Sequence, residues 1–122
     1  MALKILIVED DVFLTKAYVE FLTKEGYQVS SVTDGSLGLE KAKDEKYDLI
    51  LLDLLMPKLV GIEFLRAFQP KEHPETKVIV FTNLSSPEKE AEAIKLGAIK
   101  YLIKTNFSPN EMVNLIKKTI GS

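Results

Sequence analysis

The sequence predicts an α/β fold: a single doubly wound domain in which helices cover both faces of a five-stranded parallel sheet. Three observations support it. The 122-residue chain suits one compact domain. Five apolar, strand-length runs alternate with five stretches of helical periodicity. The short connections between them favour right-handed β-α-β units. With 46% hydrophobic and 28% charged residues, we expect residues 1–122 to fold as one domain.

The expected strands are residues 4–8, 28–32, 49–53, 77–81 and 100–103. Most of them are too uniformly apolar for a sheet with one face in water. We therefore expect parallel strands that are covered by helices on both sides.

The first three expected helices are residues 12–25, 36–46 and 61–68. The first has an apolar face and ends at Gly26, a typical helix stop. Gly38 weakens the second, because glycine has low helix propensity. The apolar face of the first helix consists of Leu14, Ala17, Tyr18, Phe21 and Leu22.

The last two helices are predicted from their starts. Ser86-Pro87 and Ser108-Pro109 each place a capping hydroxyl before a proline, which suits the first helical turn. Glu111 stands three residues after Ser108, the spacing of a capping box. The expected buried stripe of the final helix is Met112, Val113, Ile116 and Ile120.

Charge and composition exclude several classes of function. With 16 Lys and Arg against 18 Asp and Glu, the net charge of -2 gives no general attraction to nucleic acid or to an anionic membrane. The absence of cysteine excludes disulfides, thiolate metal sites and cysteine nucleophiles. No apolar stretch approaches transmembrane length, so we expect a cytoplasmic protein.

Polar residues follow four of the five expected strands. Residues 9–11, all acidic, follow the first strand, and Asp53, Thr82 and Lys104 stand at the ends of the third, fourth and fifth. The carboxyl ends of parallel strands meet at one edge of the sheet, where ligands bind. Crowded carboxylates need a cation, and Mg²⁺ suits oxygen ligands of this kind. By themselves, however, the three acids also suit a solvated helix start.

Together these groups have the composition of a phosphoryl-transfer site. A carboxylate can act as the nucleophile and form an acyl phosphate, and Asp53 is the natural candidate. Lys104 and the Thr82 hydroxyl would donate to the phosphoryl oxygens.

The chain resembles a response regulator receiver domain over essentially its whole length. The resemblance is carried by ILIVEDD, YDLILLDLLMPKLVGIEFL, VIVFTN and LGAIKYLIKT, in that order, and by the final amphipathic helix. It implies a flavodoxin-like fold with the strand order 2-1-3-4-5.

The resemblance also implies a metal site. Asp10 would bind Mg²⁺ directly and Glu9 would act through water. Asp53 would be both phosphoacceptor and metal ligand, and Leu55 would offer its backbone carbonyl. Asp11 falls outside this set, and we interpret it as a helix N-cap, or at most a contributor through water.

The remaining implied roles concern signalling. Thr82 would be the switch hydroxyl, Lys104 the lysine that pairs with the phosphoryl group, and Tyr101 an aromatic switch that turns inward. A histidine kinase, a phosphotransfer protein or a small phosphodonor would supply the phosphoryl group. The face formed by the fourth helix, fifth strand and fifth helix would then change and bind a downstream protein, or a second copy in a phosphorylation-dependent homodimer.

We therefore expect a signalling phosphoacceptor and not an enzyme: it would act only on its own phosphoryl group. The chain ends soon after the fifth helix, so we expect no output domain in it. It would be either a stand-alone receiver or a fragment of a longer regulator.

Three residues depart from the family pattern. Lys104 is followed by Thr105, where the family has a proline in a cis peptide, so the bond is either trans or strained. Asn83 is bulkier than the usual Ala or Gly. It would narrow the entrance to the site or add a hydrogen-bond donor to the phosphoryl group. Val60 replaces an acid or Asn, which we expect to leave the chemistry unchanged.

Two leucines predict a long-lived phosphorylated state. Leu55 and Leu84 each stand two residues after a site residue, where the family varies and where side chains influence the attack of water. Neither leucine can orient an attacking water, so hydrolysis of the acyl phosphate is expected to be slow.

The sequence disfavours two other functions and leaves a third open. A phosphatase of the haloacid dehalogenase type would need a second acid at Leu55. A flavin or nucleotide binder would have a phosphate-binding loop after the first strand, where this chain has acids. A receiver-shaped interaction module that does not respond to phosphorylation stays open, because of Asn83 and Thr105.

Overall fold

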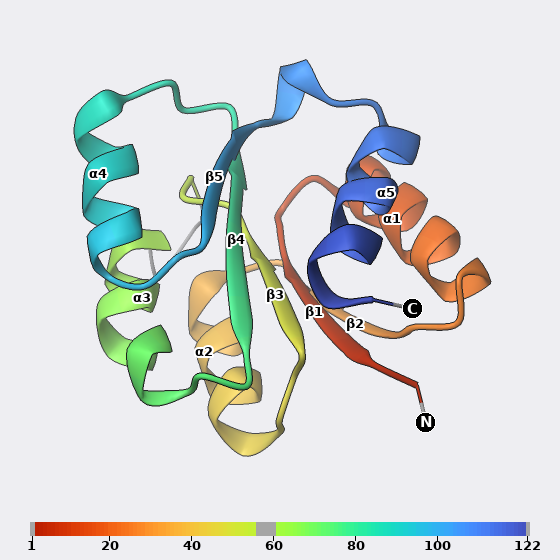
Figure 1. The fold of residues 1–122 in the computed structure, drawn as a ribbon, viewed down its shortest axis with the longest axis horizontal. Helices are drawn as coiled ribbons and strands as arrows, with labels where there is room; N and C mark the ends of the chain where they lie inside the picture. The colour runs from red at the N-terminus through yellow and green to blue at the C-terminus, as the bar shows by residue number, and fades with distance from the viewer. Residues whose placement is uncertain (1, 56–60, 122) are drawn as a thin grey trace.

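A computed structural model describes residues 2–55 and 61–121, which form a twisted parallel sheet between two layers of helices (Figure 1). The described strands are β1 (Lys4–Val8), β2 (Gln28–Val32), β3 (Leu49–Leu52), β4 (Lys77–Thr82) and β5 (Lys100–Ile103). They pair in parallel in the order β2-β1-β3-β4-β5, which confirms the predicted doubly wound sheet. Two ends differ by one residue: β3 stops before Asp53, and β4 includes Thr82.

Helices lie on both faces of the sheet. Figure 1 shows α1 and α5 on one face, and α2, α3 and α4 on the other. In residues 2–55 and 61–121 none of the helices is long and apolar enough to cross a membrane. Their bounds are α1 (Val12–Lys24), α2 (Gly35–Asp44), α3 (Gly61–Phe68), α4 (Pro87–Lys95) and α5 (Pro109–Ile120), with short 3₁₀ turns η1 (Pro70–Glu72) and η2 (Lys104–Asn106).

Capping side chains begin the helices largely where the sequence predicts. The Leu14 N–H donates to Asp11 Oδ1, so Asp11 is the N-cap of α1. Ser86 caps α4, and Ser108 caps α5 in a reciprocal capping box with Glu111. The second helix begins at residue 35 and ends at residue 44, earlier than expected at both ends.

The three central strands, β1, β3 and β4, are buried on both faces over nearly their whole length. Side chains alternate along each strand: Ile5, Ile7 and Leu49 contact the α1/α5 side, and Leu6 and Val8 the opposite side. Burying one such side chain contributes about 1.5–3 kcal/mol. Their uniform apolarity therefore reflects two covered faces, and the strand ends are the natural place for polar groups.

Gly38 is a packing residue of α2. A Cβ at this position would lie 2.9 Å from Val8 Cγ2, closer than real Cβ atoms approach other atoms. The glycine thus lets α2 sit close to β1. This explains why a residue of low helix propensity occurs in the middle of this helix.

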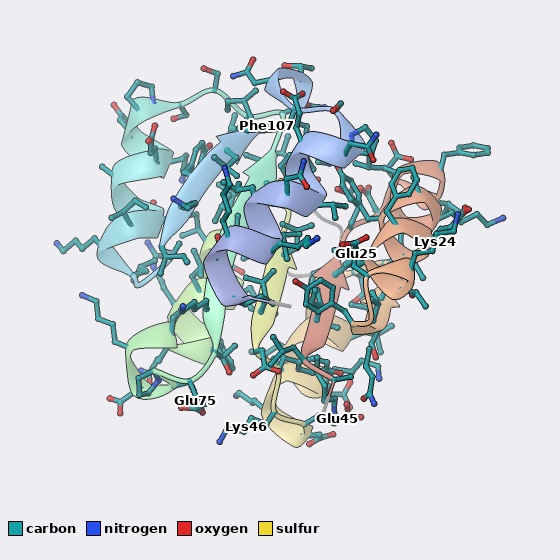
Figure 2. The ribbon with its side chains drawn as sticks, turned by 45° about the vertical axis from the view of Figure 1, so that its right-hand side comes forward. Lys24, Glu25, Glu45, Lys46, Glu75 and Phe107 are labelled. Atoms are coloured by element: carbon teal, nitrogen blue, oxygen red, sulfur yellow. The ribbon has the colours of Figure 1, made fainter. Side chains whose placement is uncertain are left out.

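The C-terminal helix α5 is held in place by contacts with a segment distant in the sequence. Glu25, labelled in Figure 2 beside the end of α1, pairs with Lys117 of α5 at 2.6 Å. The Tyr27 hydroxyl donates to the carbonyl of Gly121, just after α5. These contacts tie α5 to the loop between α1 and β2 and fix the position of α5 over the sheet.

Candidate functional site

Three carboxylates meet at the carboxyl edge of the sheet. Glu9 and Asp10 follow β1, and Asp53 follows β3, whose last residue Leu52 pairs with Val8. The register therefore places the two strand ends side by side. One carboxylate oxygen from each acid lies within 4.8 Å of the others. We call Glu9, Asp10 and Asp53 the acidic cluster.

The acidic cluster suits a hard divalent cation. Its donors are all carboxylate oxygens, which Mg²⁺ and Ca²⁺ prefer. Glu9 and Asp53 are buried, whereas Asp10 is exposed and leaves one side open to solvent. Mg²⁺ keeps several of its waters in such sites, so this half-open arrangement fits Mg²⁺.

Leu55 contributes to the site through its backbone. Its N–H donates to Asp53 Oδ1 at 3.1 Å, which fixes the orientation of that carboxylate. The Leu55 side chain is 52% exposed. The expected role of its carbonyl as a metal ligand stays a prediction.

Lys104 reaches the acidic cluster from the end of β5. Its Nζ lies 2.8 Å from Asp53 Oδ2 and 2.5 Å from Glu9 Oε1. The lysine is only 12% exposed, so it is an internal counter-ion for two buried carboxylates. No cis peptide bond occurs in residues 2–55 and 61–121, so the bond from Lys104 to Thr105 is trans. The lysine thus reaches Asp53 without a cis proline after it.

The electrostatics of the site follow from burial and pairing. Burial raises the pKa of Glu9, and this effect outweighs the hydrogen bonds from Lys104 and from the Asp11 N–H. Burial opposes the charged form of Lys104, but its hydrogen bonds to Asp53 and Glu9 raise its pKa overall. Lys104 is therefore a cation at neutral pH.

A chain of hydrogen bonds joins Thr82 to Tyr101 through Leu84. The Leu84 N–H donates to Thr82 Oγ1 at 3.2 Å, and the Tyr101 hydroxyl donates to the Leu84 carbonyl at 2.5 Å. Thr82 is fully buried at the end of β4, and the Tyr101 ring packs against the core. The loop between β4 and α4 is thus tied to both residues. The sequence contains no signal for this backbone link.

An apolar hollow of about 190 Å³ is lined in part by Leu54 and Leu55, the two residues that follow Asp53. Leu55 and Leu84, the two leucines from which slow hydrolysis is predicted, line this hollow. Leu55 is exposed and Leu84 is half-buried. The side chains of Asn83 and Thr105 are exposed. Val60 lies outside the described residues. Among the described residues, the hollow is lined by Leu54, Leu55, Ile62, Leu84 and Lys89.

Comparison with known proteins supports the sequence resemblance. Residues 5–117 match the family described as the response regulator receiver domain. The chain is 33% identical to the chemotaxis protein CheY of Thermotoga maritima over 97% of this chain and 98% of that protein. It is 40% identical to the response regulator ArlR of Staphylococcus saprophyticus over 83% of this chain, and 33% identical to ResD of Bacillus subtilis over 93%. It spans a little under half the length of each of these two regulators (45% and 46%).

Solved structures show the same fold. A CheY-like receiver domain protein from Methanospirillum hungatei superposes with a TM-score of 0.91 at 30% identity, covering 98% of this chain and 94% of that chain. The chemotaxis protein CheY4 of Vibrio cholerae superposes with a TM-score of 0.85 at 29% identity, covering 97% and 98%. The arrangement of strands and helices is therefore shared along nearly the whole chain.

Proposed function

Because the chain belongs to the response regulator receiver domain family of two-component systems, we propose that it accepts a phosphoryl group on Asp53. The donor is a phosphohistidine on a histidine kinase or phosphotransfer protein, or a small phosphodonor. The observation that carries this proposal is the convergence of Glu9, Asp10 and Lys104 on Asp53. Such a site can accept a phosphoryl group because Asp53 offers a nucleophilic carboxylate and Lys104 a positive charge beside it.

In the proposed reaction a carboxylate oxygen of Asp53 attacks the phosphorus atom. The O–P bond forms as the P–N bond to the donor imidazole breaks, and the electron pair of that bond stays on the imidazole. The Leu55 N–H and the Lys104 ammonium hold the two oxygens of Asp53 and orient the nucleophile.

We propose that Asp10, Asp53 and the Leu55 carbonyl hold Mg²⁺, with Glu9 acting through water. When bound, the ion would neutralise the charge on the phosphoryl oxygens. The close approach of three carboxylates supports this assignment. Asp11 is left out of the ligand set, because its side chain caps α1.

The proposed switch starts from Thr82 and Lys104. Lys104 pairs with one phosphoryl oxygen and the Thr82 hydroxyl donates to another. A displacement of Thr82 pulls on its hydrogen bond with the Leu84 N–H, and Leu84 in turn is bonded to Tyr101. Tyr101 and the start of α4 therefore move together with Thr82, which shifts the balance between two conformations.

The surface formed by α4, β5 and α5 would change with this conformational shift. A downstream protein or a second copy of the chain would bind to it. We infer that residues 1–122 act as one receiver domain and signal by protein contact, without turnover of an external substrate. An aspartyl phosphatase is disfavoured because Leu55, an exposed apolar residue, stands where such enzymes place a second acid.

Intact mass spectrometry tests this function. The native chain, incubated with acetyl phosphate and Mg²⁺, is expected to gain the mass of one phosphoryl group. Asp53→Asn should gain none, whereas the matched control Asp44→Asn, at an exposed acid at the end of α2, should behave like the native chain. Equal labelling of Asp53→Asn would place the phosphoryl group on another residue and overturn the role of Asp53. No labelling, even with histidine kinases, would favour a module that does not respond to phosphorylation.

A further inference from the structure

A second hollow lies between α3 and α4, at the end of the molecule away from the acidic cluster. Figure 1 shows the two helices next to each other on one face of the sheet, and the hollow is built from their last turns and from η1. Its volume is about 340 Å³, within the size range of binding sites. We call it the α3–α4 hollow. Its lining includes Leu65, Arg66, Gln69, Lys71, Lys95 and Leu96.

The α3–α4 hollow combines an apolar floor with a basic rim. Leu65 is fully buried and Leu96 half-buried, so the floor is apolar. Arg66, Lys71 and Lys95 are exposed around it, and among the described lining residues the one acid is Glu72. The rim therefore carries a net positive charge.

Two of these cations have no ion-pair partner among residues 2–55 and 61–121. Arg66 pairs with Glu92 of α4, but Lys71 and Lys95 make no ion pair with any residue of 2–55 or 61–121. A position in the last helical turn gives Lys95 a role in complementing the helix dipole. That role does not extend to Lys71, which lies in the short turn η1.

Close backbone contacts hold the α3–α4 hollow in shape. Gln69 has a left-handed backbone with φ of 57°, an uncommon conformation that directs the chain from α3 into η1. Gly97 follows α4 with φ of 114°, and a Cβ there would lie 2.9 Å from Pro70 Cβ. The ends of the two helices are thus fixed against each other, so the site is formed before any ligand arrives.

We propose that the α3–α4 hollow is a docking site for an acidic segment of a partner protein. An apolar side chain of that segment packs on Leu96, the part-exposed residue of the floor, and flanking carboxylates pair with Lys71 and Lys95. Charge complementarity favours this occupant. The ammonium groups of Lys71 and Lys95, which pair with no described residue, lie beside an apolar floor and match a peptide that contains both acidic and apolar residues. The inference goes beyond the proposed function, because nothing in it depends on the chemistry of Asp53.

Selection from a library of random dodecapeptides displayed on phage tests the proposal, with the full chain as bait. The enriched peptides should be rich in Asp and Glu around a Leu, Ile or Phe. For one synthetic peptide from the selection, Lys71→Glu and Lys95→Glu should each weaken binding by about tenfold in fluorescence anisotropy, because each reverses one attractive charge. Binding should also weaken as NaCl is raised.

The matched control is Lys16→Glu, at an exposed lysine of α1 on the other face of the sheet. It makes the same charge change and should leave the peptide affinity within twofold. Lys71 and Lys95 are exposed, so their variants are expected to fold, which a circular dichroism spectrum checks.

Several results would overturn the proposal. These are recovery of no peptide, enriched peptides without acidic residues, or equal binding by Lys95→Glu and Lys16→Glu. Sedimentation of the native chain as a dimer that Lys95→Glu dissociates would assign the α3–α4 hollow to a second copy instead. Chemical shift changes at Leu65 and Leu96 with citrate, without any peptide binding, would assign it to a small anion.

Discussion

Lys104 and Glu9 form a buried ion pair, with 2.5 Å between Nζ and Oε1. Lys104 also bonds to Asp53, so one ammonium group compensates two carboxylates at the ends of β1 and β3. Lys104 is thus the counter-ion of both carboxylates, a role that a bound Mg²⁺ would share. The stability of the site and the proposed transfer of a phosphoryl group to Asp53 therefore depend on the same charges.

Replacing Lys104 with an uncharged residue should destabilise the protein. Lys104→Met leaves Glu9 and Asp53 facing each other without their cation, and breaking a buried pair of this kind costs about 3 kcal/mol. Urea denaturation with EDTA measures the loss, and added Mg²⁺ should stabilise this variant more than the native chain.

Lys24→Met is the matched control for Lys104→Met. Both side chains of the Lys24–Glu20 ion pair are exposed. Replacing Lys24 should change the free energy of unfolding by less than about 0.5 kcal/mol. Equal losses in the two variants would contradict the role of Lys104 as an internal counter-ion.

The raised pKa of Glu9 predicts a dependence of stability on pH. Burial raises this pKa above its ordinary value of 4.5, so the folded protein binds the Glu9 proton more tightly than the unfolded chain does. The resulting stabilisation is fully present below pH 4.5 and is lost as the pH rises through the folded-state pKa. In EDTA, the native chain should lose stability relative to Glu9→Gln as the pH rises from 4.5 through the folded-state pKa.

Urea denaturation at several pH values measures this difference, and Glu88→Gln on α4 controls for the change in net charge. If the native chain instead gained stability relative to Glu9→Gln over this range, Lys104 would dominate the environment of Glu9 and the assigned direction would be wrong.

The apolar hollow lined by Leu54 and Leu55 predicts a long-lived acyl phosphate. Leu55 and Leu84 line it and offer no polar atom from their side chains to orient water. Leu55→Asn and Leu84→Asn should each lose the phosphoryl group severalfold faster than the native chain, as followed by the decay of the phosphorylated mass. Leu37→Asn, at an exposed leucine of α2, should leave the decay unchanged. Fast decay in the native chain that neither substitution alters would refute the hypothesis.

Gly38 should not tolerate a methyl group, despite its position in a helix. Gly38→Ala improves helix propensity by about 1 kcal/mol. Its Cβ meets Val8 Cγ2 at 2.9 Å, however, and overpacking a core contact costs about 1–3 kcal/mol. We expect a net loss of stability in thermal denaturation, whereas Ser36→Ala on the exposed side of α2 should be tolerated. A more stable Gly38→Ala would show that α2 can move away from β1.

Local sequence signals were sufficient to predict most of the fold. The uniformly apolar runs at Lys4–Val8 and Leu49–Leu52 indicate strands covered on both faces, and the structure confirms them. Capping residues such as Ser108 predict helix starts because their hydrogen bonds are local. The end of α2 was predicted less well. Its start does carry a local signal, because Asp34 caps it by accepting from the Leu37 N–H, but the expected start at residue 36 misses this cap. Its end at Asp44 is marked by no comparable signal.

The gathering of Glu9, Asp10, Asp53 and Lys104 was also predictable, because parallel strands bring their carboxyl ends to one edge. The exact partners of Lys104 were not. That side chain reaches across β4 to Asp53 and Glu9, a path that depends on the packing of the whole edge. The Leu84 backbone link escaped prediction for another reason: it uses main-chain atoms, which every residue possesses.

The most direct test of the central claim is to find which carboxylate carries the phosphoryl group. Borohydride reduces an acyl phosphate to a primary alcohol, and tandem mass spectrometry then locates the altered residue. After treatment with acetyl phosphate and Mg²⁺, reduction should alter Asp53 alone, and Asp53→Asn should show no altered residue. An alcohol at Asp10 or Glu9, or a phosphorylated chain with Asp53 intact, would contradict the account.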